Sequence, residues 1–139
     1  MKKSMILFFL AICFPFFVLS QKGFDIQIEI SEFKKLKGKV RVCLSNSEEN
    51  FTKECFQSIE VKVDQPIMNI IFKNIPAGTY AISLFHDEDE NGKLNTGKIF
   101  GIPTEKYGFS KNPKSRFGPP KFSKCSFEVN ANISLNIKI

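Results

Sequence analysis

The amino-acid sequence predicts an all-β protein, a single antiparallel β-sandwich of seven strands with one long ordered loop. Three observations lead to this fold class. Almost every periodic segment alternates apolar and polar residues, which is typical of half-buried strands. Turn signals separate these segments, and no stretch has the apolar spacing of an amphipathic helix. The chain has 139 residues, the size of one domain.

The first expected strand, residues 24–33 (FDIQIEISEF), places Phe24, Ile26 and Ile28 on one face and polar residues on the other. The same alternation predicts the strands that follow. The chain contains 16 Phe and no Trp, and Phe buries a large area without needing a hydrogen-bond partner, so we expect a dry aromatic core. The remaining strands are expected at residues 38–44, 58–63, 67–72, 79–85, 125–129 and 133–139.

Residues 86–122 interrupt the regular succession of short strands and turns. They separate two expected strands by far more than the ~2–5 residues that usually join paired strands. The segment is rich in Phe, Tyr, Gly and Pro. We therefore expect it to be ordered and packed on the sandwich, and it is where we look for function, because binding residues concentrate on loops held by a rigid scaffold.

The N-terminus has the features of a secretory signal peptide over residues 1–20. Two lysines precede an apolar run that only Pro15 interrupts, and the small residue Ser20 follows. The run is shorter than the ~20 residues of a membrane-spanning helix, although a retained N-terminal anchor is the alternative. We expect an exported domain of residues 21–139, located in the periplasm, at the outer membrane or outside the cell.

The charge balance excludes few partners. Removing Lys2 and Lys3 from a formal charge of +6 leaves +4, and the remaining lysines are scattered along the chain. Scattered lysines serve solubility, and no nucleic-acid recognition motif is present, so we expect no nucleic-acid partner. We expect a monomer without a transmembrane segment after export, with an envelope protein or a glycan as its partner.

Three cysteines remain after residue 20. Cys43 and Cys55 bracket a short loop, and in an oxidising compartment a disulfide between them is favoured. Cys125 alternates with apolar positions and is expected to be a small buried hydrophobe. No spacing indicates a zinc site or a redox motif.

The segment HDEDENGKLNT contains a D-x-D-x-N-G pattern. Asp87, Asp89 and Asn91 stand at alternate positions, Gly92 provides a sharp turn and Asn95 follows. Calcium prefers six to eight oxygen ligands, and such a loop directs several oxygens at one point. The pattern is equally that of a solvated tight turn.

The calcium pattern fails at its end. Lys98 stands where an EF-hand has a bidentate glutamate, so another oxygen, from Glu88, Glu90 or Glu105, has to complete the site. Affinity is then expected in the ~10⁻⁴–10⁻³ M range of extracellular modules. The candidate calcium ligands are Asp87, Asp89, Asn91, Asn95 and Glu105.

His86 is the only histidine and ends an expected strand. A catalytic role needs a carboxylate to orient it, and Asp87 is expected to point to the opposite face of the strand. The favoured interpretation is a histidine that bonds loop backbone and fixes the start of the loop. No catalytic constellation is complete, so we expect no enzymatic activity.

Aromatic and basic residues are interleaved between residues 101 and 122. Aromatics beside cations can stack on a sugar or hold an anion, or they can pin the loop to the domain. Packing is favoured over binding, and binding over catalysis. The candidate ligand-binding residues are His86, Tyr107, Phe109, Ser110, Arg116 and Phe117.

Three ordered motifs point to a family. IPAGTYAISLFHDEDENGKLNT, FGIPTEKYGFS and FGPPKF together resemble the bacterial family of domain of unknown function 2141 (DUF2141), across residues 21–139. The resemblance implies an exported protein with a transthyretin-like β-sandwich and implies no activity. One departure is Asn95, where the family usually has an acidic residue.

Three hypotheses for function follow. The first is an exported, non-catalytic accessory or binding protein of the cell envelope, with calcium clamping its loop. The second is a metal-assisted hydrolase that uses His86, Asp87 and Glu105. The third is a purely structural envelope protein, whose loop motifs serve folding alone.

Overall fold

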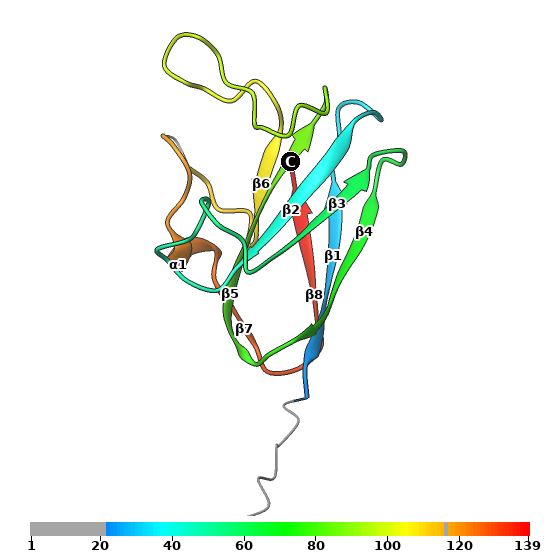
Figure 1. The fold of residues 1–139 in the computed structure, drawn as a ribbon, viewed down its shortest axis with the longest axis vertical. Coiled ribbons are helices and arrows are strands. Elements are labelled where there is room, and N and C mark those ends of the chain that lie inside the picture. The colour runs from blue at the N-terminus through cyan, green and yellow to red at the C-terminus, as the bar shows by residue number, and fades with distance from the viewer. Residues whose placement is uncertain (1–21, 116) are drawn as a thin grey trace, which may run out of the picture.

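The computed structural model describes residues 22–115 and 117–139, and these residues form a sandwich of two β-sheets with one short helix (Figure 1). The all-β prediction is therefore confirmed. The signal peptide expected at residues 1–20 lies outside the described residues. Within the described ranges, no helix is long and apolar enough to cross a membrane.

The smaller sheet has the strand order β4-β1-β8. β4 is antiparallel to β1, but β8 is parallel to it, which corrects the expectation of an entirely antiparallel sandwich. The reason is that the chain reaches β8 at the end where β1 begins: Ile133 lies opposite Ile26. The strands of this sheet are β1 (Phe24–Ser31), β4 (Met68–Ile75) and β8 (Ile133–Lys138).

The larger sheet has the order β3-β2-β5-β6, and β7 pairs with β5 as well. β5 is the longest strand, with ten residues; β7 lies along its first part and β6 along its second. The strands of this sheet are β2 (Lys39–Ser45), β3 (Gln57–Lys62), β5 (Gly78–Asp87), β6 (Tyr107–Phe109) and β7 (Phe127–Val129).

Eight strands replace the expected seven over the described residues. The additional strand, β6, lies inside the long loop and pairs with β5, so this part of the loop is ordered on the sandwich, as expected. A strand expected at residues 125–129 begins only at Phe127, because the one-turn helix α1 (Phe122–Cys125) precedes it.

The core lies between the two sheets and follows the period-two alternation of the strands. In β1, the alternate residues Ile26, Ile28 and Ile30 are fully buried while Asp25 and Gln27 are exposed. A smaller apolar cluster of Phe51, Ala81 and Cys125 lies on the outer face of β5, with Phe109 and Phe122 packed against it. The main core also includes Val40, Leu44, Phe72, Ile75, Ile82 and Ile137.

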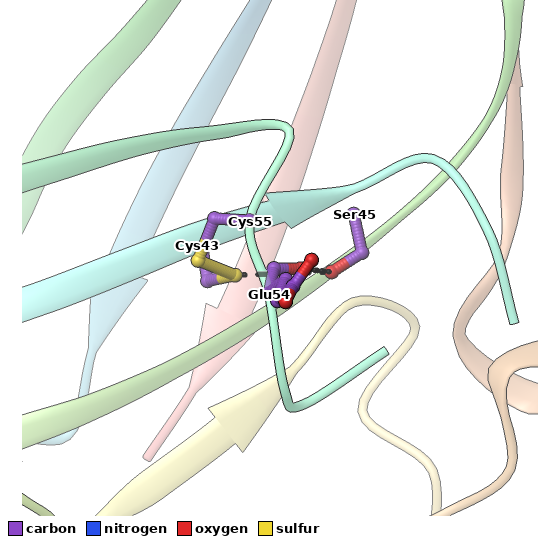
Figure 2. The surroundings of a disulfide bond; sticks show 4 residues. All are labelled: Cys43, Ser45, Glu54 and Cys55. Atoms are coloured by element: carbon purple, nitrogen blue, oxygen red, sulfur yellow. Dashed lines mark hydrogen bonds between the residues drawn. A yellow bond between two sulfur atoms is a disulfide. The ribbon is translucent and has the colours of Figure 1, made fainter. Parts of the chain in front are cut away.

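A disulfide joins Cys43 in β2 to Cys55 just before β3, as predicted (Figure 2). The two Cα atoms lie 5.3 Å apart, and the bridge closes the connection between the two strands. Within that connection the hydroxyl of Ser45 donates to the carbonyl oxygen of Glu54 at 3.4 Å. Cys125 is fully buried and unbridged, also as predicted.

Three connecting segments lie together at one end of the sandwich. Lys39 lies opposite both Lys62 and Asp87, and Ile30 lies opposite Met68. The turns 32–38 and 63–67 and the loop 88–106 therefore leave the sheets at the same end, at the top of Figure 1. We call this the loop end of the sandwich.

Candidate functional site

The last two residues of β5 point to opposite faces of the larger sheet. His86 continues the core-facing series of Ile82 and Leu84, whereas Asp87 continues the other series, with Phe85. Both side chains are fully buried. The strand thus separates the histidine from its acidic neighbour, as the sequence pattern predicts.

His86 fixes the start of the loop. Its ring Nε2 donates to the carbonyl oxygen of Lys37 at 2.6 Å, and its backbone N–H donates to the carbonyl oxygen of Lys106 at 2.8 Å. Phe33 contacts the ring edge-on, with ring centroids 5.3 Å apart. Nδ1 is buried and has no hydrogen-bond partner among the described residues. The histidine therefore ties the turn 32–38 and residue 106 to the end of β5.

Asp87 organises the acidic turn that follows it. Its carboxylate accepts hydrogen bonds from the backbone N–H groups of Asn91 (3.1 Å) and Gly92 (2.9 Å) and from Arg41 Nε (3.0 Å). Gly92 has a φ of +82°, a conformation that favours glycine. Burial alone would raise the pKa of Asp87, but the hydrogen bonds from Gly92, Arg41 and Asn91 outweigh it and hold the pKa below its usual value.

Asp89 lies on the exposed side of the same turn and bonds two amides. Its carboxylate accepts from Asn91 Nδ2 at 3.0 Å and from Asn95 Nδ2 at 2.9 Å. The two amides also bond each other, because Asn91 Nδ2 donates to Asn95 Oδ1 at 2.7 Å. The candidate ligands Asp89, Asn91 and Asn95 are therefore in mutual contact.

Glu105 closes the loop from its far end. Its Oε1 accepts the backbone N–H of Glu88 at 2.8 Å, and its Oε2 accepts that of Asn95, also at 2.8 Å. The side chain is only 7% exposed. One carboxylate thus joins the first residue of the loop, its middle and its last turn.

Three carboxylates converge at this point. Ligand atoms of Asp87, Asp89 and Glu105 all lie within 4.8 Å of one another, and His86 is not part of the group. Of the three glutamates that the sequence offered, the structure brings Glu105 to the cluster. The other two face lysines: Glu88 pairs with Lys35 at 2.8 Å and Glu90 with Lys39 at 3.6 Å.

The donor set consists of oxygen atoms alone. Carboxylate and amide oxygens are ligands for hard cations such as calcium, whereas zinc and copper sites usually include nitrogen or sulfur. Arg41 bonds Asp87 and also pairs with Glu60 at 2.9 Å, so it balances part of the negative charge. Arg41 was not predicted from the sequence, because only the strand register brings residue 41 beside residue 87.

The candidate ligand-binding residues between 107 and 117 differ in exposure. Tyr107 is 41% exposed on β6, whereas Phe109 packs on Phe51 with ring centroids 5.9 Å apart. Ser110 is fully buried and bonds backbone, so it is not available to a ligand. Phe117 is 94% exposed, and Arg116 lies outside the described residues. A surface depression is lined by Pro113, Lys114, Ser115, Phe117, Pro119, Pro120, Lys121 and Lys124.

Comparisons with known proteins agree with the family resemblance. The model of the family described as "Uncharacterized protein conserved in bacteria (DUF2141)" matches residues 28–136. Neither the curated proteins nor the solved structures gave a match. The family match runs from β1 into β8 and so includes both sheets and the acidic loop. The chain therefore belongs to the DUF2141 family.

Proposed function

We propose that this protein is an exported, non-catalytic binding module of the bacterial cell envelope, and that a calcium ion held by Asp87, Asp89 and Glu105 clamps its binding loop. The convergence of these three carboxylates within 4.8 Å carries the proposal. Export follows from the expected signal peptide at residues 1–20, and an oxidising compartment agrees with the disulfide. We assign the sandwich to the transthyretin type, as the family resemblance implies.

The donor set fits a calcium ion if two amides rotate. Each carboxylate has about four lone-pair sites, and the hydrogen bonds to Asp87, Asp89 and Glu105 leave some of them free. Asn91 and Asn95 now direct Nδ2 toward Asp89. Turning each amide by half a rotation exchanges nitrogen for oxygen and adds two ligands, at the cost of the hydrogen bond that Asn91 Oδ1 accepts from the backbone N–H of Lys93 at 2.8 Å. Water completes a shell of six to eight oxygens.

The clamp acts on the segment between its ligands. Asp87 and Asp89 lie at the start of the loop and Glu105 at its end, so a shared ion fixes both arms of residues 90–104. Ordering a loop before it binds lowers the entropy cost of binding. Calcium would thus prepare this segment as a binding surface.

Thermal unfolding in EDTA and in calcium tests the clamp. A site with a Kd of ~10⁻⁴–10⁻³ M stabilises the fold by about 1–3 kcal/mol at ~10 mM calcium. That gain corresponds to a rise of several degrees in Tm. The Asp89→Asn variant should lose the rise, because it removes one charged ligand from the cluster at an exposed position.

Glu90→Gln is the matched control. Glu90 is also exposed and adjacent in sequence, and the substitution removes the same charge, but its carboxylate is outside the cluster. The control should keep the calcium-dependent rise. If calcium leaves the Tm of the unmodified protein unchanged, or if both variants respond alike, the acidic cluster is a solvated turn and the clamp is wrong.

The hydrolase hypothesis receives no comparable support. It requires His86 to act beside Asp87 and Glu105, yet the ring bonds the carbonyl of Lys37 and points into the core face of β5. A catalytic base must reach a substrate or a water in the site. We therefore propose no catalytic role for His86.

A further inference from the structure

The segment between the proposed ligands forms a narrow finger, residues 95–104. Its two arms are joined by hydrogen bonds from Thr104 N–H to the Asn95 carbonyl at 2.8 Å and from Gly97 N–H to the Ile102 carbonyl at 2.7 Å. Thr96 and Pro103 also form a β-bridge. In Figure 1 the finger projects at the upper left, beyond the ends of the strands.

The tip of the finger is apolar and almost wholly exposed. Ile99 is 72% exposed, Phe100 91% and Ile102 63%. Single exposed apolar residues are common on protein surfaces, but three neighbours at the tip of a projecting loop form a patch. No other part of the described chain covers them to any large extent, so the tip is convex.

The charged side chains between residues 91 and 104 are all lysines. Lys93 and Lys98 are exposed on or beside the finger, and the sequence from residue 91 to residue 104 contains no carboxylate. The finger is therefore apolar at its end and positively charged on its flanks. This combination is complementary to a surface with an apolar interior and anionic groups above it.

A second turn at the loop end also exposes an apolar side chain, although two of its lysines, Lys35 and Lys37, pair with Glu88. Leu36 is 52% exposed and stands between the exposed residues Lys34, Lys35 and Lys37. Ile67, in the neighbouring turn 63–67, is 46% exposed. Five of the nine exposed large apolar side chains of the described residues thus belong to the loop end: Leu36, Ile67, Ile99, Phe100 and Ile102.

We propose that the finger docks on an anionic phospholipid membrane, with Ile99, Phe100 and Ile102 inserted among the headgroups. A convex apolar tip enters a bilayer surface without a matching pocket, which a protein partner would have to provide. Apolar burial at the interface and lysine attraction to anionic lipids act together in such binding. The inference rests on the export part of the proposed function, since envelope membranes expose anionic phospholipids to an exported protein.

The acidic cluster modulates this docking without being required for it. Asp87, Asp89 and Glu105 lie at the base of the finger and repel anionic headgroups. A calcium ion there would cancel part of that repulsion and fix both arms of the finger. Calcium should therefore strengthen the binding, whereas the apolar tip should be needed with or without it.

The absence of Trp from the sequence gives a direct probe of insertion. Phe100→Trp introduces a single tryptophan at the tip, and Phe117→Trp introduces one at an equally exposed position in a different loop. With vesicles of phosphatidylglycerol and phosphatidylcholine in equal parts, emission of the tip variant should shift to the blue and be quenched by brominated lipid. The Phe117 variant should show neither change, and phosphatidylcholine vesicles alone should give much less of both.

Vesicle co-sedimentation measures the contribution of the tip. Phe100→Ser should weaken binding about tenfold, as expected when burial of one large apolar side chain is lost, and Phe117→Ser should not. Both positions are exposed, so both variants should keep the Tm of the unmodified protein. Added salt should also weaken binding, because screening reduces the attraction of Lys93 and Lys98.

Three results would overturn the membrane assignment. The first is no binding to anionic vesicles. The second is an equal loss of vesicle binding in Phe100→Ser and Phe117→Ser. The third is binding to phosphatidylcholine vesicles as strong as binding to the anionic vesicles. A dimer in sedimentation velocity that Phe100→Ser abolishes, without vesicle binding, would assign the tip to a second copy of the chain. Asp89→Asn separates the two proposals: it should remove only the calcium-dependent part of vesicle binding. A calcium-dependent Tm without vesicle binding would support the calcium clamp and contradict the membrane docking.

Discussion

The hydroxyl of Ser110 joins β5 to helix α1. It accepts the backbone N–H of Ile82 at 2.9 Å and donates to the carbonyl oxygen of Cys125 at 2.6 Å, and the side chain is fully buried. Ser110→Ala would leave both backbone groups without their partner in the interior. We expect it to lower the free energy of unfolding by about 1–3 kcal/mol, measured by urea denaturation.

Ser123→Ala provides the control for this substitution. Ser123 lies on α1 at an exposed position, so its loss should change the free energy of unfolding by less than about 0.5 kcal/mol. Equal stability of the two variants would contradict the structural role of Ser110 and reopen it as a ligand-binding residue.

Asp87 makes the stability of the fold dependent on acid. Its folded pKa lies below the unfolded value of about 3.9, so the unfolded chain binds the proton more readily. The stability that Asp87 contributes is complete above the unfolded pKa and is lost as the pH falls through the folded pKa. Urea denaturation should therefore show decreasing stability below about pH 4.

Asp87→Asn tests the source of this pH dependence. The amide cannot form the ion pair with Arg41, so the variant should be less stable at neutral pH and should lose less on acidification. Glu90→Gln, at an exposed residue, should keep the steeper dependence. If the stability of Asp87→Asn falls with pH in parallel with that of the unmodified protein, the acid sensitivity belongs to other carboxylates. Glu88 is the first candidate, because its hydrogen bond with Lys35 lowers its pKa.

Local spacing explains which site residues the sequence revealed. Asp87, Asp89 and Asn91 alternate within one turn, so their proximity follows from the chain itself. Glu105 was one of three alternatives, because its position depends on how the finger returns to the sheet. The role of Ser110 depends on packing between distant segments, for which a single sequence gives no pattern. The sequence also has no signal that residues 95–104 project from the sandwich and expose Phe100.

Over the residues that the structure describes, the β2–β3 connection is the one closed by a disulfide. The Cys43–Cys55 disulfide spans a sequence separation of 12 residues. In the chain-entropy model, closing a loop of this length stabilises the fold by about 3 kcal/mol. Replacing both cysteines by serine should reduce the free energy of unfolding by about that amount, measured by urea denaturation.

Cys125, which is not bridged, provides an internal control for a test of the disulfide by thiol labelling. Burial raises the pKa of its thiol to about 11, so it stays protonated and protected in the folded protein. In a protein of residues 21–139, a thiol reagent should therefore label no cysteine in the native, non-reduced state and only Cys125 after unfolding. Labelling of Cys43 or Cys55 without a reductant would contradict the disulfide.

The longer strands were the plainest in the sequence. β1, β2 and β5 each have at least seven residues, and their alternation is plain in the sequence. β6 has three residues, too few for a period to show, and α1 is a single turn without a side-chain cap. The parallel pairing of β8 with β1 was not predictable either, since strand pairing depends on contacts between the two ends of the chain.

At the scale of the whole molecule, the two sheets meet closely where β6 crosses β8. Asn112, just after β6, donates through Nδ2 to the carbonyl of Asn136 at 2.9 Å and accepts the N–H of Lys138 at 2.9 Å. Lys106 Nζ donates to the carbonyl of Ile139 at 3.4 Å. The long loop therefore joins one edge of the larger sheet to the last strand of the smaller one.

Gly108 makes this approach possible, and its replacement tests the closure of the sandwich. A Cβ atom at residue 108 would lie 2.7 Å from the carbonyl oxygen of Lys138 and 2.9 Å from Cγ2 of Ile137, and both neighbours belong to β8. Because backbone cannot move aside cheaply, Gly108→Ala should push the sheets apart and lower the free energy of unfolding by about 1–3 kcal/mol.

Gly97→Ala is the control, since a Cβ there would meet its nearest atom only at 3.6 Å. Urea denaturation should separate the two variants, and hydrogen exchange should show increased opening of β8 in Gly108→Ala alone. Similar stability of both variants would mean that the two sheets tolerate a wider spacing at this edge, and that the long loop is held mainly through β5.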